Sequence, residues 1–244
     1  MNGADLIDTS HSWSLAGITG YTHPLLVINS ETVIYTWIII GILALLLVAA
    51  RFLLRQTKIG RFLVINFVIF FIDLTKQALG NVNFSHCVFA ASLFIFIALC
   101  NTASLVPWLD EPTKDLNTAL ALGIISFLYV QIVTIRTHGL GSYLKDFFKP
   151  FFVMLPLNII GKLSSIVSIS FRLFGNIFGG AVITKLWFGL IHGSLIAELL
   201  GIFTGMNFII IGFFTLFEGL LQAFVFAMLT LTYLSIGIQQ EGGH

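Results

Sequence analysis

Charged residues are scarce in this chain: they make up 9% of its 244 residues, against about 25% in soluble domains. The 12 basic and 11 acidic residues nearly cancel, so no net charge is available to capture nucleic acid, and no nucleic-acid partner is expected. Cysteine occurs only as Cys87 and Cys100, both in an apolar stretch, which excludes a disulfide framework. The CxxC and HExxH motifs and the Walker phosphate loop are missing, so no metal, cofactor or ATP site is expected on this chain.

Apolar sequence is abundant instead, because 57% of the residues are hydrophobic. A helix needs about 20 apolar residues to cross a bilayer, so long apolar runs that are free of charge or carry only single, widely spaced charges predict membrane spans. The predicted spans are 31–51, 87–109, 115–136, 157–192 and 200–238. We therefore predict an all-α integral membrane protein with about five long membrane-embedded helices, the last two tilted and paired as a hairpin over 157–238.

Two further stretches, 62–80 and 140–155, mix phenylalanines with charged residues. This composition is typical of amphipathic helices at a membrane surface, so we predict one or two interfacial helices. The alternative is a loop followed by a slightly displaced span. Residues 1–30 contain no Lys or Arg and are expected to form an external tail, ahead of a single membrane domain at 31–244.

The basic residues predict the orientation. Five of the twelve lie between the first and second spans and three lie between the third and fourth. Cytoplasmic loops are enriched in Lys and Arg, so the N-terminus is expected outside and the C-terminus in the cytoplasm. The N-terminus lacks the basic segment of a secretory leader. We expect a multi-pass protein of a bacterial plasma (inner) membrane, with the mitochondrial inner membrane as the alternative.

One permanent charge lies deep in the fourth predicted span. Arg172 follows Pro156 by 16 residues, which is about 24 Å along a helix. Arginine keeps its proton, and a charge at this depth costs at least about 2.5–3.5 kcal/mol, so it requires a partner or water. An ion path and a structural ion pair inside the bundle both meet this requirement.

Polar residues recur at every fourth position around this arginine: Ser164, Ser168, Arg172 and Asn176. They form one polar stripe on a helix, and the nearby glycines allow another helix to approach closely. In the last span, Thr215, Glu218 and Gln222 share a face. If the hairpin turns near residue 197, Arg172 and Gln222 are each 25 residues from the turn and meet at the same depth.

Segments around these residues resemble subunit a of F-type ATP synthases. The similarity is most specific at ISFRLFGNIFGG (169–180) and LLQAFVFAMLTLTYLSI (220–236). It extends to DLNTALALG (115–123) and LPLNIIGKL (155–163), in the order of the family. The resemblance covers the chain from about residue 25 to its C-terminus.

The resemblance implies a subunit without an ATP site that forms two proton half-channels beside a ring of c subunits. A proton enters by one half-channel, neutralises a ring carboxylate, travels with the turning ring and leaves by the other, and the rotation drives ATP synthesis. The implied partners are the c-subunit ring, the b-type subunits of the peripheral stalk, the remainder of the complex and membrane lipid. The implied ion is H⁺, with Na⁺ the less favoured alternative.

The resemblance also assigns residues. It makes Arg172 the essential charge that separates the half-channels, and it matches Gln222 and Asn176 to the family's glutamine and asparagine. The chain departs from many members at Ala181 and Thr215, where those members have Glu or His. Glu218 is our candidate replacement; the alternative is a hydrogen-bonded residue of the bundle that relays no proton.

The remaining candidates have less distinct roles. His192 and Glu198 line an outer vestibule or are solvated helix ends. Lys162, Ser164 and Ser168 border the exit path, although membrane serines often serve packing. Lys185 is expected to pair with Glu218 or another acid. Three further acids are expected in a solvated external loop, with a role in gathering protons as the alternative: Asp110, Glu111 and Asp115.

Two other functions fit a chain of this composition. One is a self-contained ion-coupled secondary transporter that binds substrate at Arg172, and the other is a membrane scaffold without transport. No internal repeat is present in the sequence, which argues against the transporter.

Overall fold

The computed structural model describes residues 12–14, 27–81, 83–106, 109, 111–146, 153, 155–191, 199 and 205–239. Regular structure in these residues is helical, apart from one antiparallel ribbon of β1 (Ser12–Ser14) and β2 (Val27–Asn29). The long helices are α2 (Ser30–Gln56), α3 (Lys58–Leu79), α4 (Phe84–Thr102), α5 (Leu116–His138) and α7 (Leu155–Ile191). The predicted all-α fold is confirmed.

The last part of the described chain is one helical rod made of three segments: α9 (Met206–Ile211), the π-helical segment η6 (Gly212–Glu218) and α10 (Gly219–Gln239). Three short helices complete the description: η3 (Ala103–Leu105), η4 (Pro112–Lys114) and α6 (Leu140–Asp146). A π-helical turn is rare and is frequently found at functional sites. This segment was not predicted from the sequence.

Six helices of the described chain are long and apolar enough to cross a membrane. Five of them correspond to the predicted spans. The sixth is α3, which covers the stretch predicted to be interfacial. It is one regular helix, capped by the Thr57 hydroxyl, which accepts from the Gly60 amide at 3.1 Å, and ended by Gly80 in the left-handed conformation with φ of 75°.

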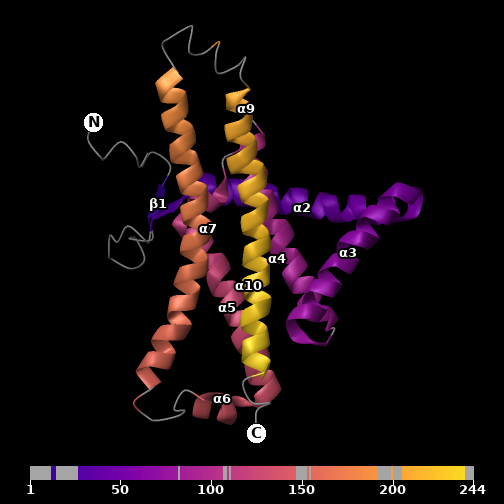
Figure 1. The fold of residues 1–244 in the computed structure, drawn as a ribbon, viewed down its shortest axis with the longest axis vertical. Coiled ribbons are helices and arrows are strands. Elements are labelled where there is room, and N and C mark those ends of the chain that lie inside the picture. The colour runs from indigo at the N-terminus through magenta and orange to yellow at the C-terminus, as the bar shows by residue number, and fades with distance from the viewer. Residues whose placement is uncertain are drawn as a thin grey trace.

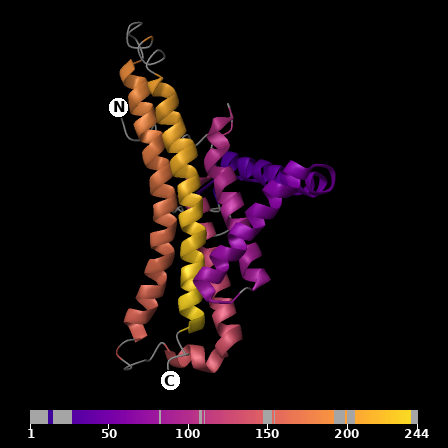
Figure 2. The ribbon, with the colours of Figure 1, turned by 45° about the vertical axis from the view of Figure 1, so that its right-hand side comes forward.

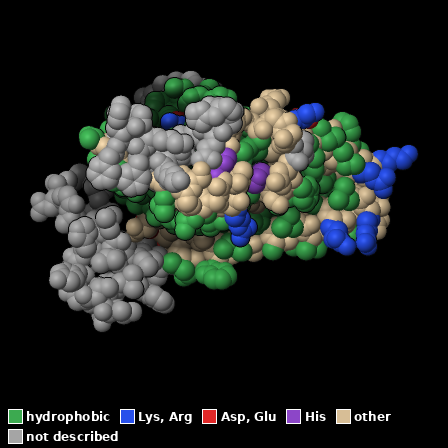
Figure 3. Space-filling view, turned by 90° about the horizontal axis from the view of Figure 1, so that it is seen from below, with side chains coloured by type: hydrophobic (Ala, Val, Ile, Leu, Met, Phe, Trp, Pro, Cys, Tyr) green, Lys and Arg blue, Asp and Glu red, His purple; other side chains and the backbone are tan. Residues whose placement is uncertain are grey.

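The surface of these helices suits a lipid environment. Trp37 and Leu45 on α2 are both 69% exposed. Apolar side chains cover much of the face seen from below, and Lys and Arg gather toward one end (Figure 3). Because exposed apolar area of this extent would be costly in water, the described chain is a multi-pass membrane protein.

The core of the molecule lies where α4, α5, α7 and α10 meet. Its central residues include Ile97 of α4, Leu173 of α7 and Phe226 of α10, all fully buried. A buried pair of hydroxyls, Ser126 of α5 and Thr230 of α10, is joined by a hydrogen bond of 2.6 Å. This packing fixes α7 and α10 against α4 and α5.

The two long helical segments α7 and α9–α10 run side by side as an antiparallel hairpin, while α2 runs across them (Figures 1 and 2). Two contacts define the register. The Trp187 indole donates to the Asn207 side-chain oxygen at 2.8 Å, and Gly180 faces the Phe214 side chain. In each pair the two residues are equally far along the chain from position 197, which itself lies outside the described residues. The predicted hairpin register is therefore confirmed at these contacts.

Candidate functional site: an exposed arginine beside a polar pocket

Arg172 lies on the face of α7 that this chain leaves uncovered. Its side chain is exposed, and it makes no hydrogen bond or ion pair with any described residue. Ile169, Leu173 and Ile177 on the other side of α7 are buried in the core. The structural ion pair inside the bundle, one of the two alternatives from the sequence, is therefore not formed within the described chain.

The polar stripe continues along the same face. Ser164 and Ser168 are exposed like Arg172, and Asn176 is half-buried. A Cβ added at Gly175 or Gly179 would meet nothing within 4 Å. The stripe and its glycines thus form an open surface that can receive a neighbouring helix.

Gln222 of α10 is buried, with 4% of its surface exposed. Neither Gln222 nor Arg172 makes a hydrogen bond among the described residues, and their meeting at the same depth stays a prediction. Glu218 ends the π-helical segment. Its side chain is half-buried, and its Oε2 atom is buried without a hydrogen-bond partner in the described structure.

A polar pocket of about 280 Å³ opens beside this region. Its wall on α7 extends from Asn176, one turn from Arg172, to Phe188, and its wall on η6 includes Phe214 and Thr215. Ala181 and Thr215, the two positions noted above as departures from the family that the chain resembles, both line it. Lys185 also lines this pocket, and the ion pair predicted for it is absent from the described residues.

The connection between α4 and α5 supplies the remaining wall, through Ser104, Glu111 and Lys114. Here one prediction is wrong. Glu111 was expected in a solvated loop, but its side chain is only 8% exposed, because the connection packs through η4 against α4, α5 and α7. Asp115 instead caps α5, accepting from the Asn117 amide at 3.0 Å, and Asp110 lies outside the described residues.

A buried polar chain ties this connection to the last helix. The Thr113 hydroxyl donates to the Asn101 side-chain oxygen at 2.9 Å, and the Asn101 amide donates to the Gly219 carbonyl at 2.9 Å. Asn101 and Thr113 are both fully buried. Sequence reasoning missed both residues, although an Asn in an otherwise apolar span is a signal worth following.

A second pocket, of about 210 Å³, lies at the opposite end of the hairpin, near α6. It is lined by residues of α5, α6, α7 and α10, among them Lys162, Ser165 and Gln131. The Lys162 ammonium lies 4.3 Å from the centre of the Tyr143 ring, whose hydroxyl donates to Gln131 at 2.6 Å. His192 and Glu198, both predicted for an outer vestibule, lie outside the described residues.

The fold and this site define a multi-pass membrane protein with a fixed cation on the open face of a helical hairpin. Comparison with known proteins identifies its family. Residues 33–235 match the family model described as ATP synthase A chain. The chain is 35% identical over 208 residues to the ATP synthase subunit a of Moorella thermoacetica, covering 84% of this chain and 89% of that protein.

Two further relatives give the same result. The chain is 30% identical over 217 residues to the ATP synthase subunit a 2 of Acaryochloris marina, covering 87% of each protein. It is 32% identical over 221 residues to the ATP synthase subunit a 2 of Picosynechococcus sp., covering 88% of each. The chain belongs to the ATP synthase A chain family, as its resemblance to that family predicted.

Proposed function

We propose that this chain forms the two proton half-channels beside a ring of c subunits and couples proton flow to rotation of that ring and to ATP synthesis. The observation that carries the proposal is the exposed Arg172 on a helix face that nothing in the described chain covers. A permanent charge in a membrane requires a partner, and a carboxylate on a neighbouring ring meets that requirement. The chain itself holds no ATP site in this proposal.

The electrostatics of the arginine suit this role. A guanidinium lowers the pKa of a nearby carboxyl, so a protonated ring site that reaches Arg172 releases its proton into the exit path. The same positive charge repels protons and blocks a direct leak between the half-channels. The pocket that ends one turn from Arg172 supports an inlet, and the second pocket at the Lys162 end supports an outlet.

The orientation in this proposal has the N-terminus outside and the C-terminus in the cytoplasm, in a bacterial plasma membrane. The exposed cations at the corner of α2 and α3 support it: Arg51, Arg55, Lys58 and Arg61. Lys76 lies near the other end of α3. Because both ends of α3 are basic, both are expected on the cytoplasmic side, and we assign α3 to the cytoplasmic surface of the membrane. The other five long helices then cross the membrane.

The partners and the ion complete the proposal. The exposed stripe on α7 receives the c-subunit ring, the b-type subunits of the peripheral stalk join elsewhere on the chain, and lipid covers the apolar faces. The translocated ion is H⁺, with Na⁺ as the alternative that sequencing the c subunit would test. A self-contained transporter is less well supported, because the described chain offers Arg172 no partner of its own.

Purification tests the partnership directly. When this chain is isolated from its native membrane through an affinity tag, a ring of small hydrophobic subunits is expected to accompany it in mild detergent. A cysteine at position 168, on the exposed stripe, is expected to cross-link to that ring, whereas one at the buried position 173 is the negative control. Isolation of the chain without a ring would refute the proposal.

A Glu218→Gln substitution tests the inner end of the inlet. Glutamine keeps the shape of the side chain but cannot take up a proton, so proton entry is expected to slow by about 100-fold, the usual scale for loss of an acid–base group. ATP-driven acidification of inverted membrane vesicles measures the rate. An unchanged rate in a fully assembled complex would remove Glu218 from the path and leave it a residue of the bundle.

A further inference from the structure

We infer that Glu111, on the connection between α4 and α5, is the proton-accepting side chain of the outer half-channel. The inference rests on the proposed function and names the group that carries protons through the 280 Å³ pocket. It is argued from the side chains that line this pocket, which come from the α4–α5 connection as well as from the two helices of the hairpin.

Chemistry narrows the choice to one residue. A proton relay needs a group that gains and loses a proton readily. Hydroxyls and amides do not, and a lysine ordinarily keeps its proton at neutral pH. Among the described residues that line the pocket, Glu111 is the one carboxylic acid. The others on its polar walls are Ser104, Lys114, Asn176, Thr184, Lys185 and Thr215. Ala181 and Thr215 therefore leave the two helix walls without an acid.

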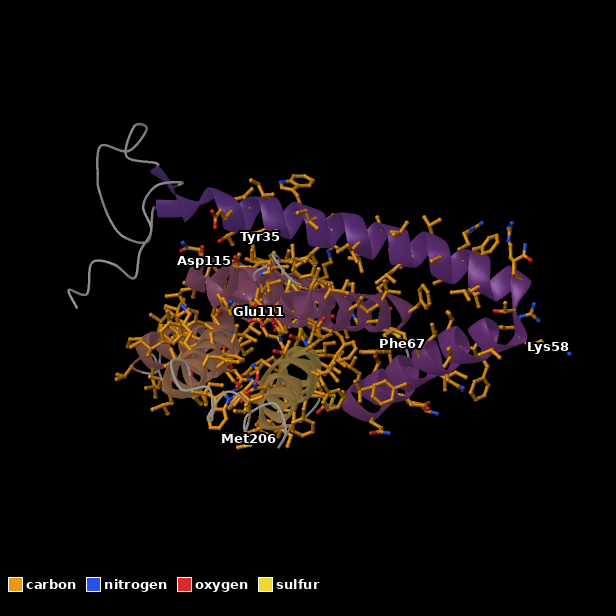
Figure 4. The ribbon with its side chains drawn as sticks, turned by 90° about the horizontal axis from the view of Figure 1, so that it is seen from above. Tyr35, Lys58, Phe67, Glu111, Asp115 and Met206 are labelled. Atoms are coloured by element: carbon orange, nitrogen blue, oxygen red, sulfur yellow. The ribbon has the colours of Figure 1, made fainter. Side chains whose placement is uncertain are left out.

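The position of Glu111 is fixed by packing on both sides of it in the chain. The Ser104 hydroxyl donates to one of its carboxylate oxygens. Pro112 follows it. The next residue, Thr113, donates a hydrogen bond to Asn101, which in turn donates to the Gly219 carbonyl. Seen from above, Glu111 lies among the helices, far from the α2–α3 corner marked by Lys58 (Figure 4). A buried acid held this firmly is a fixed feature of the pocket.

The pocket gives Glu111 access to the deeper site. It extends along α7 from Phe188 to Asn176, twelve residues, or about 18 Å of helix. Asn176 is one turn, about 6 Å, from Arg172. Lys114 and Lys185 line the same pocket, and their positive charges offset the charge of a buried carboxylate.

The proton balance of the step is simple. The Glu111 carboxylate takes a proton from a hydronium ion of the external water, which leaves a water molecule and a neutral carboxylic acid. The acid then gives that proton to water inside the pocket and returns to its carboxylate form. One proton has moved inward, and Glu111 is ready for the next.

Three variants of the assembled complex test the inference: Glu111→Gln, Glu111→Asp, and Glu111→Gln combined with Ala181→Glu. Proton pumping into inverted vesicles and proton-driven ATP synthesis are measured for each. We expect Glu111→Gln to lower both rates by about tenfold or more. This loss is smaller than the usual loss for a catalytic acid, because water remains in the pocket and carries some protons. Glu111→Asp should keep part of the rate. The double variant should recover part of it, because position 181 lines the same pocket.

Glu31→Gln is the matched control, since Glu31 is an exposed acid at the start of α2 that does not line the pocket, and its rate should be unchanged. Normal pumping by Glu111→Gln, while Arg172→Ala is inactive, would overturn the inference and leave the proposed function intact. Failure of Ala181→Glu to restore any rate in an assembled complex would also overturn it, because the loss would then be structural. Normal pumping by Arg172→Ala would instead refute the proposed function.

Discussion

Replacing Arg172 with alanine is expected to abolish proton-driven ATP synthesis while the complex still assembles. Assembly should survive because the exposed Arg172 side chain makes no hydrogen bond or ion pair with the rest of the described chain. The substitution therefore removes no contact that holds α7 against its neighbours. Loss of function without loss of structure is the result that separates a functional charge from a structural one.

The size of the effect follows from electrostatics. Two unit charges 4 Å apart interact by about 4 kcal/mol at an effective dielectric constant of 20, which is roughly a thousandfold in the proton affinity of a carboxyl. Without the guanidinium, a ring carboxyl would keep its proton past the exit, and protons would leak between the half-channels. Lysine should restore little, because a lysine in this setting can lose its proton and so its charge.

Two measurements check this result. ATP synthesis after an imposed proton gradient should fall to background in Arg172→Ala, and passive proton leak through the membrane should rise. Arg55→Ala is the control, since Arg55 is an exposed arginine in the last turn of α2, outside the hairpin, and it should keep most of the activity. Substantial synthesis by Arg172→Ala would contradict the role assigned to the arginine.

The hairpin that carries this charge was predictable from spacing alone. Its two helices are long and apolar, with only single, widely spaced charges, and a turn near residue 197 was assumed between them. The contacts between Trp187 and Asn207 and between Gly180 and Phe214 agree with that register. Periodicity also placed Ser164 and Ser168 with Arg172 on one face, because all three residues lie within one regular helix.

The pocket could not be predicted in the same way. Glu111 lies in a polar loop segment followed by proline, which in most chains is exposed. It is buried where the connection packs against other helices, among them α7, which is distant in sequence. The π-helical segment before Gly219 has no sequence signal that we recognise. Helical periodicity predicts which residues share a face of one helix. It does not predict which loop will pack against that face.

The polar chain through Asn101 leads to the second large expected effect. Asn101→Leu keeps a side chain of similar size but removes the donor to the Gly219 carbonyl and the acceptor of the Thr113 hydroxyl. Each buried group left without a partner costs about 1–3 kcal/mol, so the substitution should destabilise the chain by roughly 2–6 kcal/mol. We expect less assembled complex in the membrane, a lower melting temperature of what does assemble, and impaired proton entry.

Two further variants show whether Asn101 acts through this chain of hydrogen bonds. Thr102→Val is the control, since the neighbouring Thr102 hydroxyl donates to the Ala98 carbonyl of its own helix at 2.7 Å, and its effect should be small. Thr113→Val combined with Asn101→Leu removes one of the two orphaned groups, so the double variant should be less destabilised than the sum of the single ones. Strict additivity, or a wild-type melting temperature for Asn101→Leu, would show that the buried chain does not hold the α4–α5 connection against the last helix. The non-additive result would mean that Asn101 fixes the π-helical end of the hairpin and the pocket wall that carries Glu111 as one unit.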